Sequence, residues 1–563
     1  MRCVSVTLTT VASIIAIFNP LAKAEKYDVL IKNGTLYDGT GNAPIKADVA
    51  ISDGRIAAIG DLNKDKGKTT INAEGLAVAP GFINMLSHAP DSLIVDSRGM
   101  SDIEQGVTLE VFGEYSQGPI TAKDRAADEA SQTDFKYKIE WTTLGEFMDY
   151  LVKRGTAPNI ASFVGASTIR VYVLGLENRD PTPDELDAMR EHVRQSMKDG
   201  AMGVTSALIY PPASYASTRE LIELCKVASE YGGMYIVHMR SEGNKLLEAI
   251  DETIKIARDA NLPAEIYHLK MAGRNNWDKL DDVIAKVEQA QKEGLRITAD
   301  MYNYTAGATG LDSCVPPWVR EGGRAKLIER LQDPEIRARV AAEMKQDSDE
   351  WENLYYAAGS PENLIPLEFK TDALKKYTGK SIAQIANLRE TTPEATVMDL
   401  LVEDGTRITT VYFLMAEENV KRQIALPWVS FGSDAGAPAA EGLFLNSSVH
   451  PRAYGNFSRL LGKYVREEKV ISLEEAVRKL TSLPASNLGV KDRGLLKIGY
   501  HADIAIFDPD TIGDHATFAD PHQYSVGMEH VFVNGVQVLK KGKHTGAAPG
   551  QIVHGPGWIG REN

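Results

Sequence analysis

Eight short apolar runs, separated by helical segments, constrain the fold of this chain more than any other feature of its sequence. Buried strands that alternate with helices are typical of repeated β-α units around a parallel sheet. Eight units predict an α/β fold with a closed, TIM-like (β/α)8 barrel, in which functional groups sit at the carboxyl ends of the strands. The runs are "GFINMLS", "VTLEVFG", "NIASFVG", "AMGVTSALIY", "MYIVHMR", "AEIYHLK", "LRITADMY" and "PWVSFGSD", all within residues 81–488.

Several helices in this region have starts that can be read from capping residues. The stretch "TPDE" at residues 182–185 combines a capping threonine, a proline suited to the first turn and a glutamate at the third position. Ser217 with Glu220 and Ser472 with Glu475 have the same spacing. The three sites predict reciprocal capping boxes.

The two ends of the chain, residues 25–80 and 489–563, show a different pattern in which apolar and polar residues alternate. The dipeptides Asn33-Gly34, Asp53-Gly54 and Asn534-Gly535 favour hairpin turns. We expect both ends to build one small β-sandwich domain together.

One connection in the predicted barrel is much longer than the others. About residues 305–426 lie between the seventh and eighth runs, which is too long for a simple loop. We expect a helical insertion over the barrel mouth, which is a candidate lid.

Residues 1–24 have the pattern of a secretory signal peptide. Arg2 precedes an apolar stretch from about Val4 to Phe18, and Ala22-Lys23-Ala24 forms a small-x-small cleavage triplet. A membrane anchor is the alternative, but the apolar stretch is shorter than the roughly 20 residues that span a bilayer. The sequence therefore predicts an exported protein, periplasmic or secreted, with no stable membrane anchor after cleavage.

The mature chain has few cysteines and an acidic balance. After cleavage it keeps Cys225 and Cys314, which we expect to be free thiols because they are distant and only two. The formal net charge of −15 argues against a nucleic-acid groove or an anionic membrane surface as partner. A small-molecule substrate remains as the expected partner, and the oligomeric state is open.

Ionisable residues stand at several predicted strand ends. Glu114 follows the second run, His238 and His268 end the fifth and sixth, and Asp434 ends the eighth. A carboxylate and two imidazoles leave one position of a tetrahedral zinc site open for water, and a nearby aspartate can take a proton from that water. Each residue alone also has a structural explanation, as a hydrogen-bonded histidine or a carboxylate paired with Arg or Lys.

The first predicted strand lacks the second histidine that would complete a metal-binding pair. Its alternate positions hold Leu86 and His88. We expect His88 to contact the substrate or to form a hydrogen bond in the mouth, and a weak second metal is the remaining alternative.

Longer motifs carry a resemblance to a known family. Two runs are specific: "GAMGVTSALIYPPASYAST" and "HPRAYGNFSRLLGKYVREE". Five further stretches match, and all the matches occur in the family's order: "VHMRSEG", "YHLKMAGRNNW", "ADMYNY", "GSDAG" and "RGLLKIGYHADIAIFDP". Together they resemble the N-acyl-D-amino-acid deacylase (D-aminoacylase) branch of the amidohydrolase superfamily, over nearly the whole mature chain. The resemblance implies a β-sandwich plus barrel, a lid, a tightly held zinc and hydrolysis of an N-acyl amide on a D-amino acid.

The resemblance also implies roles for individual residues. His238 and His268 match the histidine ligands of the tight zinc site, and Asp434 matches the catalytic aspartate. Lys270, Tyr210 and the tyrosines of "DMYNY", Tyr302 and Tyr304, fall where the family holds the substrate's carboxylate.

Two departures from the family pattern bear on the metal. The first-strand motif Asp-x-His-x-His reads Asn84-Met85-Leu86-Ser87-His88, and "GEYS" stands where the family has "GNCG" with its cysteine ligand. A carboxylate can replace a thiolate on zinc, so Glu114 is the expected third ligand of one zinc ion per chain. The fourth run also has no lysine that could be carboxylated as a metal bridge. A cyclic amide is therefore a less expected substrate than a linear one.

The sequence thus predicts a zinc-dependent hydrolase of a linear amide, with Asp434 as catalytic acid and base and with a substrate that carries a free carboxylate. Two alternatives stay open: an amidohydrolase acting on a peptide, lactone or cyclic amide, and a non-catalytic periplasmic binding protein derived from the fold. The acyl group and the amino-acid side chain are not specified.

Overall fold

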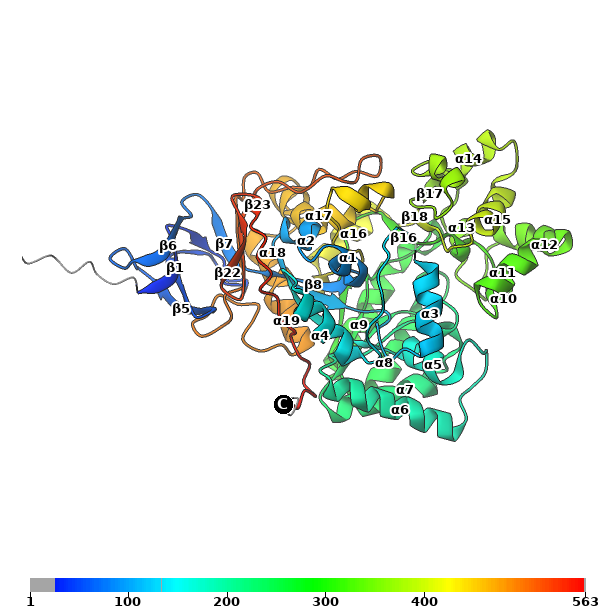
Figure 1. Ribbon diagram of the computed structural model, residues 1–563, viewed down its shortest axis with the longest axis horizontal. Coiled ribbons are helices and arrows are strands. Elements are labelled where there is room, and N and C mark those ends of the chain that lie inside the picture. Colours follow the sequence, from blue (N-terminus) through cyan, green and yellow to red (C-terminus); the bar gives the residue numbers. More distant parts are fainter. Residues whose placement is uncertain (1–25, 133, 561–563) are drawn as a thin grey trace, which may run out of the picture.

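The computed structural model describes residues 26–132 and 134–560 (Figure 1). The predicted signal peptide, residues 1–24, lies outside the described residues. Within the two described ranges, every helix is too short or too polar to cross a membrane.

All eight predicted runs contain parallel strands. One sheet has the order β10-β9-β8 and another the order β11-β12-β13-β14-β15-β19. Their bounds are β8 Phe82–Ser87, β9 Val107–Phe112, β10 Asn159–Ser162, β11 Val164–Gly165, β12 Gly203–Ala207, β13 Met234–His238, β14 Ala264–Ile266, β15 Ile297–Met301 and β19 Val429–Phe431.

The two parallel sheets meet at both of their edges. Only Phe163 separates β10 from β11, and its backbone N–H donates to the carbonyl of Phe112 at 3.0 Å. At the other edge Ser87 forms a parallel bridge with Ala435, and the N–H of Asp434 donates to the carbonyl of Leu86 at 2.9 Å. The strand order therefore runs from β8 to β19 and returns to β8, which brings the ends of β8 and β19 side by side.

Helices alternate with these strands along the chain (Figure 1). α7 packs between α6 and α8, as expected for consecutive β-α units. The α-helices outside the insertion are α1 Pro90–Val95, α2 Met100–Ile103, α3 Ala122–Ser131, α4 Leu144–Arg154, α5 Ala166–Leu174, α6 Pro183–Lys198, α7 Thr218–Glu230, α8 Leu246–Ala260, α9 Leu280–Lys292, α17 Arg452–Arg459, α18 Leu473–Leu480 and α19 Ser482–Leu488.

The capping predictions are correct for one helix and half correct for two. At α6 the capping box is reciprocal, because Thr182 caps the N–H of Glu185 and Glu185 accepts from the N–H of Thr182. At α7 and α18 the serine accepts from the glutamate N–H, but the return bond is not formed. Glu220 pairs with Arg170 instead, and Glu475 pairs with Arg478, since a guanidinium is the stronger partner for a carboxylate.

The two chain ends share one sheet, with the order β23-β22-β21-β20-β7-β2-β3. A second sheet, β5-β4-β1-β6, lies against it through a shared apolar cluster that includes Ile31, Val49, Ile504 and Phe532. The bounds are β1 Tyr27–Lys32, β2 Thr35–Leu36, β3 Ile45–Lys46, β4 Asp48–Ser52, β5 Arg55–Gly60, β6 Gly67–Asn72, β7 Ala77–Pro80, β20 Ile504–Phe507, β21 Met528–Val533, β22 Val536–Lys540 and β23 Lys543–His544.

Two of the three predicted hairpins are present. Asp53-Gly54 joins β4 to β5, and Asn534-Gly535 joins β21 to β22, with positive φ at all four residues. The prediction at Asn33-Gly34 is wrong, because β1 and β2 belong to different sheets. The N–H of Asn33 donates to the Asp48 carboxylate at 2.9 Å, so the turn carries the chain from one sheet to the other.

The insertion, residues 305–426, contains strands as well as helices, which corrects the expectation of a purely helical segment. β16 (Ala306–Gly310), β18 (Thr409–Phe413) and β17 (Leu364–Pro366) form an antiparallel sheet, and β16 pairs with β18 where the chain leaves and returns. "AGATG" is small and glycine-rich, so its strand could not be read from β-propensity. The α-helices of the insertion are α10 Pro317–Arg320, α11 Arg324–Leu331, α12 Pro334–Met344, α13 Leu354–Ala357, α14 Ile382–Leu388, α15 Pro393–Asp404 and α16 Glu417–Ala425.

The insertion has an apolar core of its own, which includes Leu311, Leu354 and Val397. Its helices lie at the opposite end of the molecule from the sheets built by the chain ends (Figure 1). Cys225 in α7 and Cys314 at the start of the insertion are both buried and free, as expected.

Candidate active site

Three loops after parallel strands hold non-glycine residues in a strained backbone conformation. Glu114 follows β9 with φ 63°, His268 follows β14 with φ 34°, and Asp434 follows β19 with φ 50°. Positive φ is uncommon for residues other than glycine, and such outliers cluster at functional sites. His238 is the last residue of β13, so all four side chains start from the same ends of the strands.

Two glycines allow these loops to approach their neighbours closely. A Cβ on Gly113 would lie 1.8 Å from the Tyr267 hydroxyl oxygen, and a Cβ on Gly432 would lie 2.7 Å from the backbone nitrogen of Leu86. Only glycine fits at such distances. The glycine of "FGE" therefore lets the loop of Glu114 pack against Tyr267, after β14, and the glycine of "FGSD" lets the loop of Asp434 pack against β8.

Glu114, His238 and His268 form a compact group of possible metal ligands. Oε1 of Glu114 lies 2.7 Å from Nδ1 of His238 and 3.0 Å from Nε2 of His268, and one ligand atom from each residue lies within 4.8 Å of the other two. Nε2 of His238 is buried and has no hydrogen-bond partner among the described residues. A carboxylate and two imidazoles at this spacing fit a catalytic zinc with one open position.

A second group of possible ligands shares Glu114. Nε2 of His88 lies 3.0 Å from Oδ1 of Asp434 and 3.5 Å from Oε2 of Glu114, and these three residues also satisfy the 4.8 Å spacing. Leu86 contributes nothing to it, because its side chain is fully buried in an apolar cluster. The structure thus places His88 in the mouth, between the two carboxylates.

Both carboxylates are held in the ionised form. Burial would raise the pKa of Glu114, but the imidazoles of His238 and His268 hold that pKa well below its usual range. Burial opposes ionisation of Asp434 too, yet the charge of Arg452 lowers its pKa to about 2. Nη2 of Arg452 lies 2.9 Å from the Asp434 carboxylate.

Lys270 lies beneath the histidines rather than free in the cavity. Its Nζ donates to the Glu242 carboxylate at 2.6 Å and lies 2.7 Å from Nδ1 of His268. The carboxylate of Glu242 is in turn 3.0 Å from the same His268 nitrogen. The Lys270–Glu242 pair therefore fixes the orientation of the His268 ring, which is the role of second-layer partners at metal sites.

Two residues of the site were not assigned from the sequence. Glu242 stands four residues after His238, in "HMRSEG", and this spacing was the available signal. Arg452, in the "HPRAYG" stretch, forms an ion pair with Asp434 itself. Its Nε and Nη1 are buried and have no hydrogen-bond partner among the described residues, and its guanidinium lies 4.4 Å from the centre of the Tyr302 ring.

A cavity of about 630 Å³ joins these groups. The hydroxyl of Tyr210 contacts Thr309 of the insertion at 2.8 Å, so the insertion forms part of the cavity wall. Eight of the nine predicted site residues line this cavity: His88, Glu114, Tyr210, His238, His268, Lys270, Tyr302 and Asp434.

Tyr304 does not line this cavity, which corrects its predicted role in substrate binding. Its hydroxyl lies 3.4 Å from the carbonyl of Pro451 and 3.5 Å from the Asp514 carboxylate. Both tyrosines lie beyond β15, which ends at Met301, so the side-chain alternation of a strand does not apply to them.

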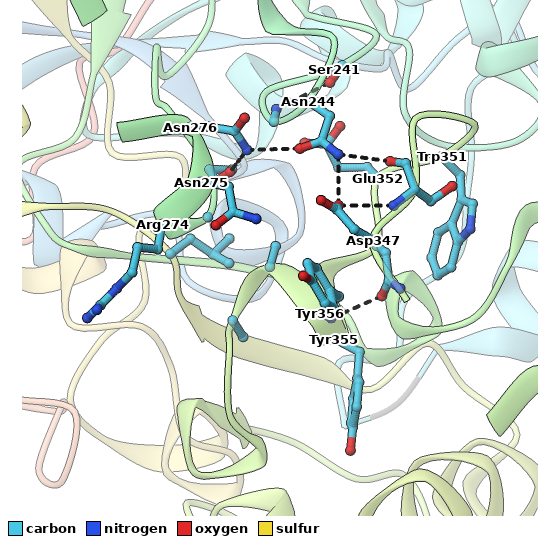
Figure 2. A pocket seen from close by; sticks show the side chains of 18 of the residues that line it. Ser241, Asn244, Arg274, Asn275, Asn276, Asp347, Trp351, Glu352, Tyr355 and Tyr356 are labelled. Atoms are coloured by element: carbon cyan, nitrogen blue, oxygen red, sulfur yellow. Dashed lines mark hydrogen bonds between the residues drawn. The ribbon is translucent and has the colours of Figure 1, made fainter. Parts of the chain in front are cut away.

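A larger cavity, of about 1300 Å³, lies between the loop after β13 and the insertion (Figure 2). Asn244 donates to Asp347 at 2.8 Å, and the Glu352 carboxylate accepts from the N–H of Glu242 at 3.1 Å. A Cβ on Gly243 would lie 2.9 Å from that Glu352 oxygen. None of the possible metal ligands lines this cavity, so it is separate from the reactive groups, but Glu352 ties the insertion to the loop that carries Glu242.

The chain resembles several proteins of known activity. The model of the amidohydrolase family matches residues 69–539. The D-aminoacylase of Alcaligenes xylosoxydans xylosoxydans is 33% identical over 94% of this chain and 98% of its own length, and the N-acyl-D-glutamate deacylase of the same organism is 30% identical over 94% and 97%.

Solved structures agree with the sequence comparisons. The N-acyl-D-glutamate deacylase of Bordetella bronchiseptica, in a complex with zinc and a phosphonate inhibitor, has a TM-score of 0.78 at 27% identity, and covers 94% of this chain and all of its own. A D-aminoacylase structure has a TM-score of 0.75 at 29% identity with the same coverage. The chain therefore belongs to the amidohydrolase family, in the branch of the D-aminoacylases and N-acyl-D-amino-acid deacylases, which are hydrolases of carbon–nitrogen bonds other than peptide bonds.

Proposed function

We propose that this protein is a zinc-dependent hydrolase that converts an N-acyl-D-amino acid to the free D-amino acid and a carboxylate. The observation that carries the proposal is the group Glu114, His238 and His268, with ionised Asp434 beside it in one cavity. The relatives that act on N-acyl-D-amino acids support the choice of substrate class.

The proposal includes the finer architecture. The two parallel sheets form one closed (β/α)8 barrel, the chain ends form a β-sandwich, and the insertion acts as a lid over the mouth. The joined edges of the parallel sheets and the contact of Tyr210 with Thr309 support these assignments.

One tightly held zinc is the proposed cofactor, with Glu114, His238 and His268 as its ligands. When bound, it would polarise the amide carbonyl and lower the pKa of a water molecule. The second group, His88 with Glu114 and Asp434, is the weaker site because Leu86 supplies no ligand. A D-aminoacylase of similar structure is described by one-metal activation and second-metal attenuation, which supports a single working metal.

Asp434 is the proposed proton carrier. Its low pKa keeps it ionised, so it can accept the proton of the attacking water and return it to the leaving amine. Arg452 and His88 hold its two oxygens at 2.9 and 3.0 Å and thereby fix its direction. The positive φ of Asp434 serves the same purpose, since it aims the side chain back over the strand ends.

The substrate's carboxylate is proposed to bind on the side of Arg452, Lys270 and Tyr302. Arg452 offers two buried nitrogen donors without partners, Nε and Nη1, and an ionised carboxylate would satisfy them by charge-assisted hydrogen bonds. Lys270 adds positive charge although it is already paired, and Tyr210 would close the cavity from the insertion side. Anchoring the substrate in this way places its amide near the metal ligands.

Export to the periplasm or the medium is part of the proposal and rests on residues 1–24 alone. The amino-terminal sequence of protein recovered from the periplasm should begin at Glu25.

The test combines metal content with turnover on matched D and L substrates. Purified protein should bind about one zinc per chain and hydrolyse N-acetyl-D-amino acids in preference to their L forms. Asp434→Asn should keep the zinc and lose at least about 10³-fold in kcat. Asp91→Asn, an exposed acid at the cavity rim, is the matched control and should stay near wild type. Absence of zinc binding, or the absence of turnover on the whole panel by the zinc-loaded protein, would refute the proposal.

A further inference from the structure

A buried polar cluster lies directly below the proposed reactive groups. Asn84 on β8, Asp102 on α2, Glu110 on β9 and Ser433 after β19 are all fully buried. Nδ2 of Asn84 lies 2.8 Å from Oγ of Ser433, 3.0 Å from the Glu110 carboxylate and 3.3 Å from the Asp102 carboxylate. Two amide hydrogens are thus shared among three oxygens, so this side of Asn84 is fully used as a donor.

The other side of Asn84 holds the backbone of the loop that carries Asp434. Its Oδ1 accepts from the N–H of Ser433 at 2.8 Å. Asn84 therefore contacts both the backbone and the side chain of Ser433. The next two residues are tied to the same strand, because the N–H of Asp434 donates to Leu86 and the carbonyl of Ala435 accepts from His88, each at 2.9 Å.

The two carboxyl groups below Asn84 have no cationic partner. Within residues 26–132 and 134–560, no Lys, Arg or His forms an ion pair with Asp102 or Glu110. Burial raises the pKa of both, and the charge of Glu110 raises that of Asp102 further, whereas the hydrogen bond with Asp102 acts in the opposite direction on Glu110. A dry pair of acids of this kind holds a proton, and it still presents carboxyl oxygens that need a donor.

Asn84 stands between this acid pair and the Ser433 loop, and only an amide meets both needs. It donates to the acids from one atom and accepts from the Ser433 N–H with the other. An aspartate at this position would place a third carboxyl in the cluster, with no hydrogens to donate unless a further proton were taken up.

We propose that Asn84 is a positioning residue for Asp434, acting through Ser433, and that the Asp102–Glu110 acid pair sets the orientation of the Asn84 amide. The inference deepens the proposed function, since it assumes that Asp434 carries the proton in the same site. It assigns no contact between Asn84 and the substrate or the metal.

The test exchanges the amide of Asn84 and the carboxyl of Glu110, whose side chains are in contact. Asn84→Asp should lower kcat by about 10- to 100-fold, leave KM within about twofold and leave the zinc content unchanged, because Asp434 is displaced while the ligands and the carboxylate anchor are not. Adding Glu110→Gln gives the cluster one amide and two carboxyl groups again, as in the wild type. The double variant N84D/E110Q should therefore recover kcat to within about fivefold of wild type. Ser433→Ala keeps the N–H contact and loses the hydroxyl, so it should fall between N84D and wild type.

Each other outcome overturns the inference. An unchanged kcat in N84D would show that Asn84 does not position Asp434, and loss of zinc would show that it acts on the metal site instead. A double variant no better than N84D would show that the acid pair does not set the amide. Crystal structures of N84D and wild type give a readout without turnover: Asp434 should move from its 2.9 Å contact with Arg452, whereas failure of the proposed function alone would leave this displacement in place.

Discussion

Glu110 and Glu114 are separated by four positions on one strand and its loop, yet their environments are opposite. Glu110 faces Asn84 and Asp102, and burial raises its pKa. Glu114 faces His238 and His268, and its pKa is held well below the usual range although its side chain is only 12% exposed. Burial thus raises the pKa of a carboxyl on this strand, and facing imidazoles lower the pKa of the carboxyl in the loop that follows. In the proposed function Glu114 binds the metal, and Glu110 helps to hold Asn84.

The largest expected effect separates these two glutamates. Glu114→Gln should lose zinc and at least about 10³-fold in kcat, because an uncharged amide is a poor replacement for an anionic ligand. Glu110→Gln should keep both the zinc and most of the activity, because its side chain faces Asn84 rather than the proposed zinc ligands, and glutamine still offers an acceptor oxygen. Metal analysis and kcat for the two variants, which carry the same chemical change, test the contrast directly. Zinc loss in E110Q would erase the distinction.

Leu86 lies on β8, two residues after Asn84, which contacts Glu110, and two residues before His88, which contacts Glu114. It packs against Gly113 and Gly432, the glycines that precede Glu114 and Ser433. Leu86→His would restore the family's histidine at this position, but in an apolar cluster without a hydrogen-bond partner. We expect it to lower the free energy of unfolding by about 2–4 kcal/mol.

Zinc stoichiometry in Leu86→His should stay at one per chain, because Glu114 is already engaged by the tight site. Leu86→Met, which conserves volume, is the control and should cost less than about 1.5 kcal/mol. Denaturant unfolding and metal analysis give both numbers. Two zinc ions per chain in L86H, with unchanged stability, would mean that the mouth is built for a binuclear centre.

The same contrast shows what the sequence could reveal. Glu114, His238, His268 and Asp434 follow buried runs, and parallel strands bring such ends to one edge, so their meeting was predictable without a structure. The pairing of Arg452 with Asp434 was not predictable, because it depends on the path of the chain after β19.

Asn84 and Tyr304 show a second limit. In the sequence, Asn84 stands where the family motif has an aspartate, and no function could be inferred for it. Its structural partners, Asp102 and Glu110, come from elements that carry no recognisable motif. Tyr304 stands two residues from Tyr302, but both follow the end of β15, and in the loop Tyr304 turns towards Pro451 while Tyr302 lines the cavity. Sequence spacing fixes which residues arrive at a strand end, and loop geometry decides where each side chain points.

Glu352, which is half-buried, extends the comparison to a third carboxyl and carries the smallest expected effect. Burial, with the nearby charge of Glu242, raises its pKa to about 7, even though it accepts a hydrogen bond from the Glu242 N–H and Lys270 acts in the opposite direction. Because the folded pKa lies above the ordinary value of 4.5, the stabilisation is complete below about pH 4.5 and is lost as the pH rises through 7.

Glu352→Gln keeps the acceptor oxygen but has no proton to lose, so its unfolding free energy should not fall over this range. We expect the variant to gain about 1–2 kcal/mol relative to wild type between pH 5 and pH 8. Glu350→Gln removes the same charge from an exposed position two residues away and should give no pH-dependent difference. Denaturant unfolding at the two pH values measures the gap. A gap that stays constant with pH would show that Glu352 is ionised throughout, and that the Glu242 N–H and Lys270 suffice to keep a half-buried acid charged where no imidazole faces it.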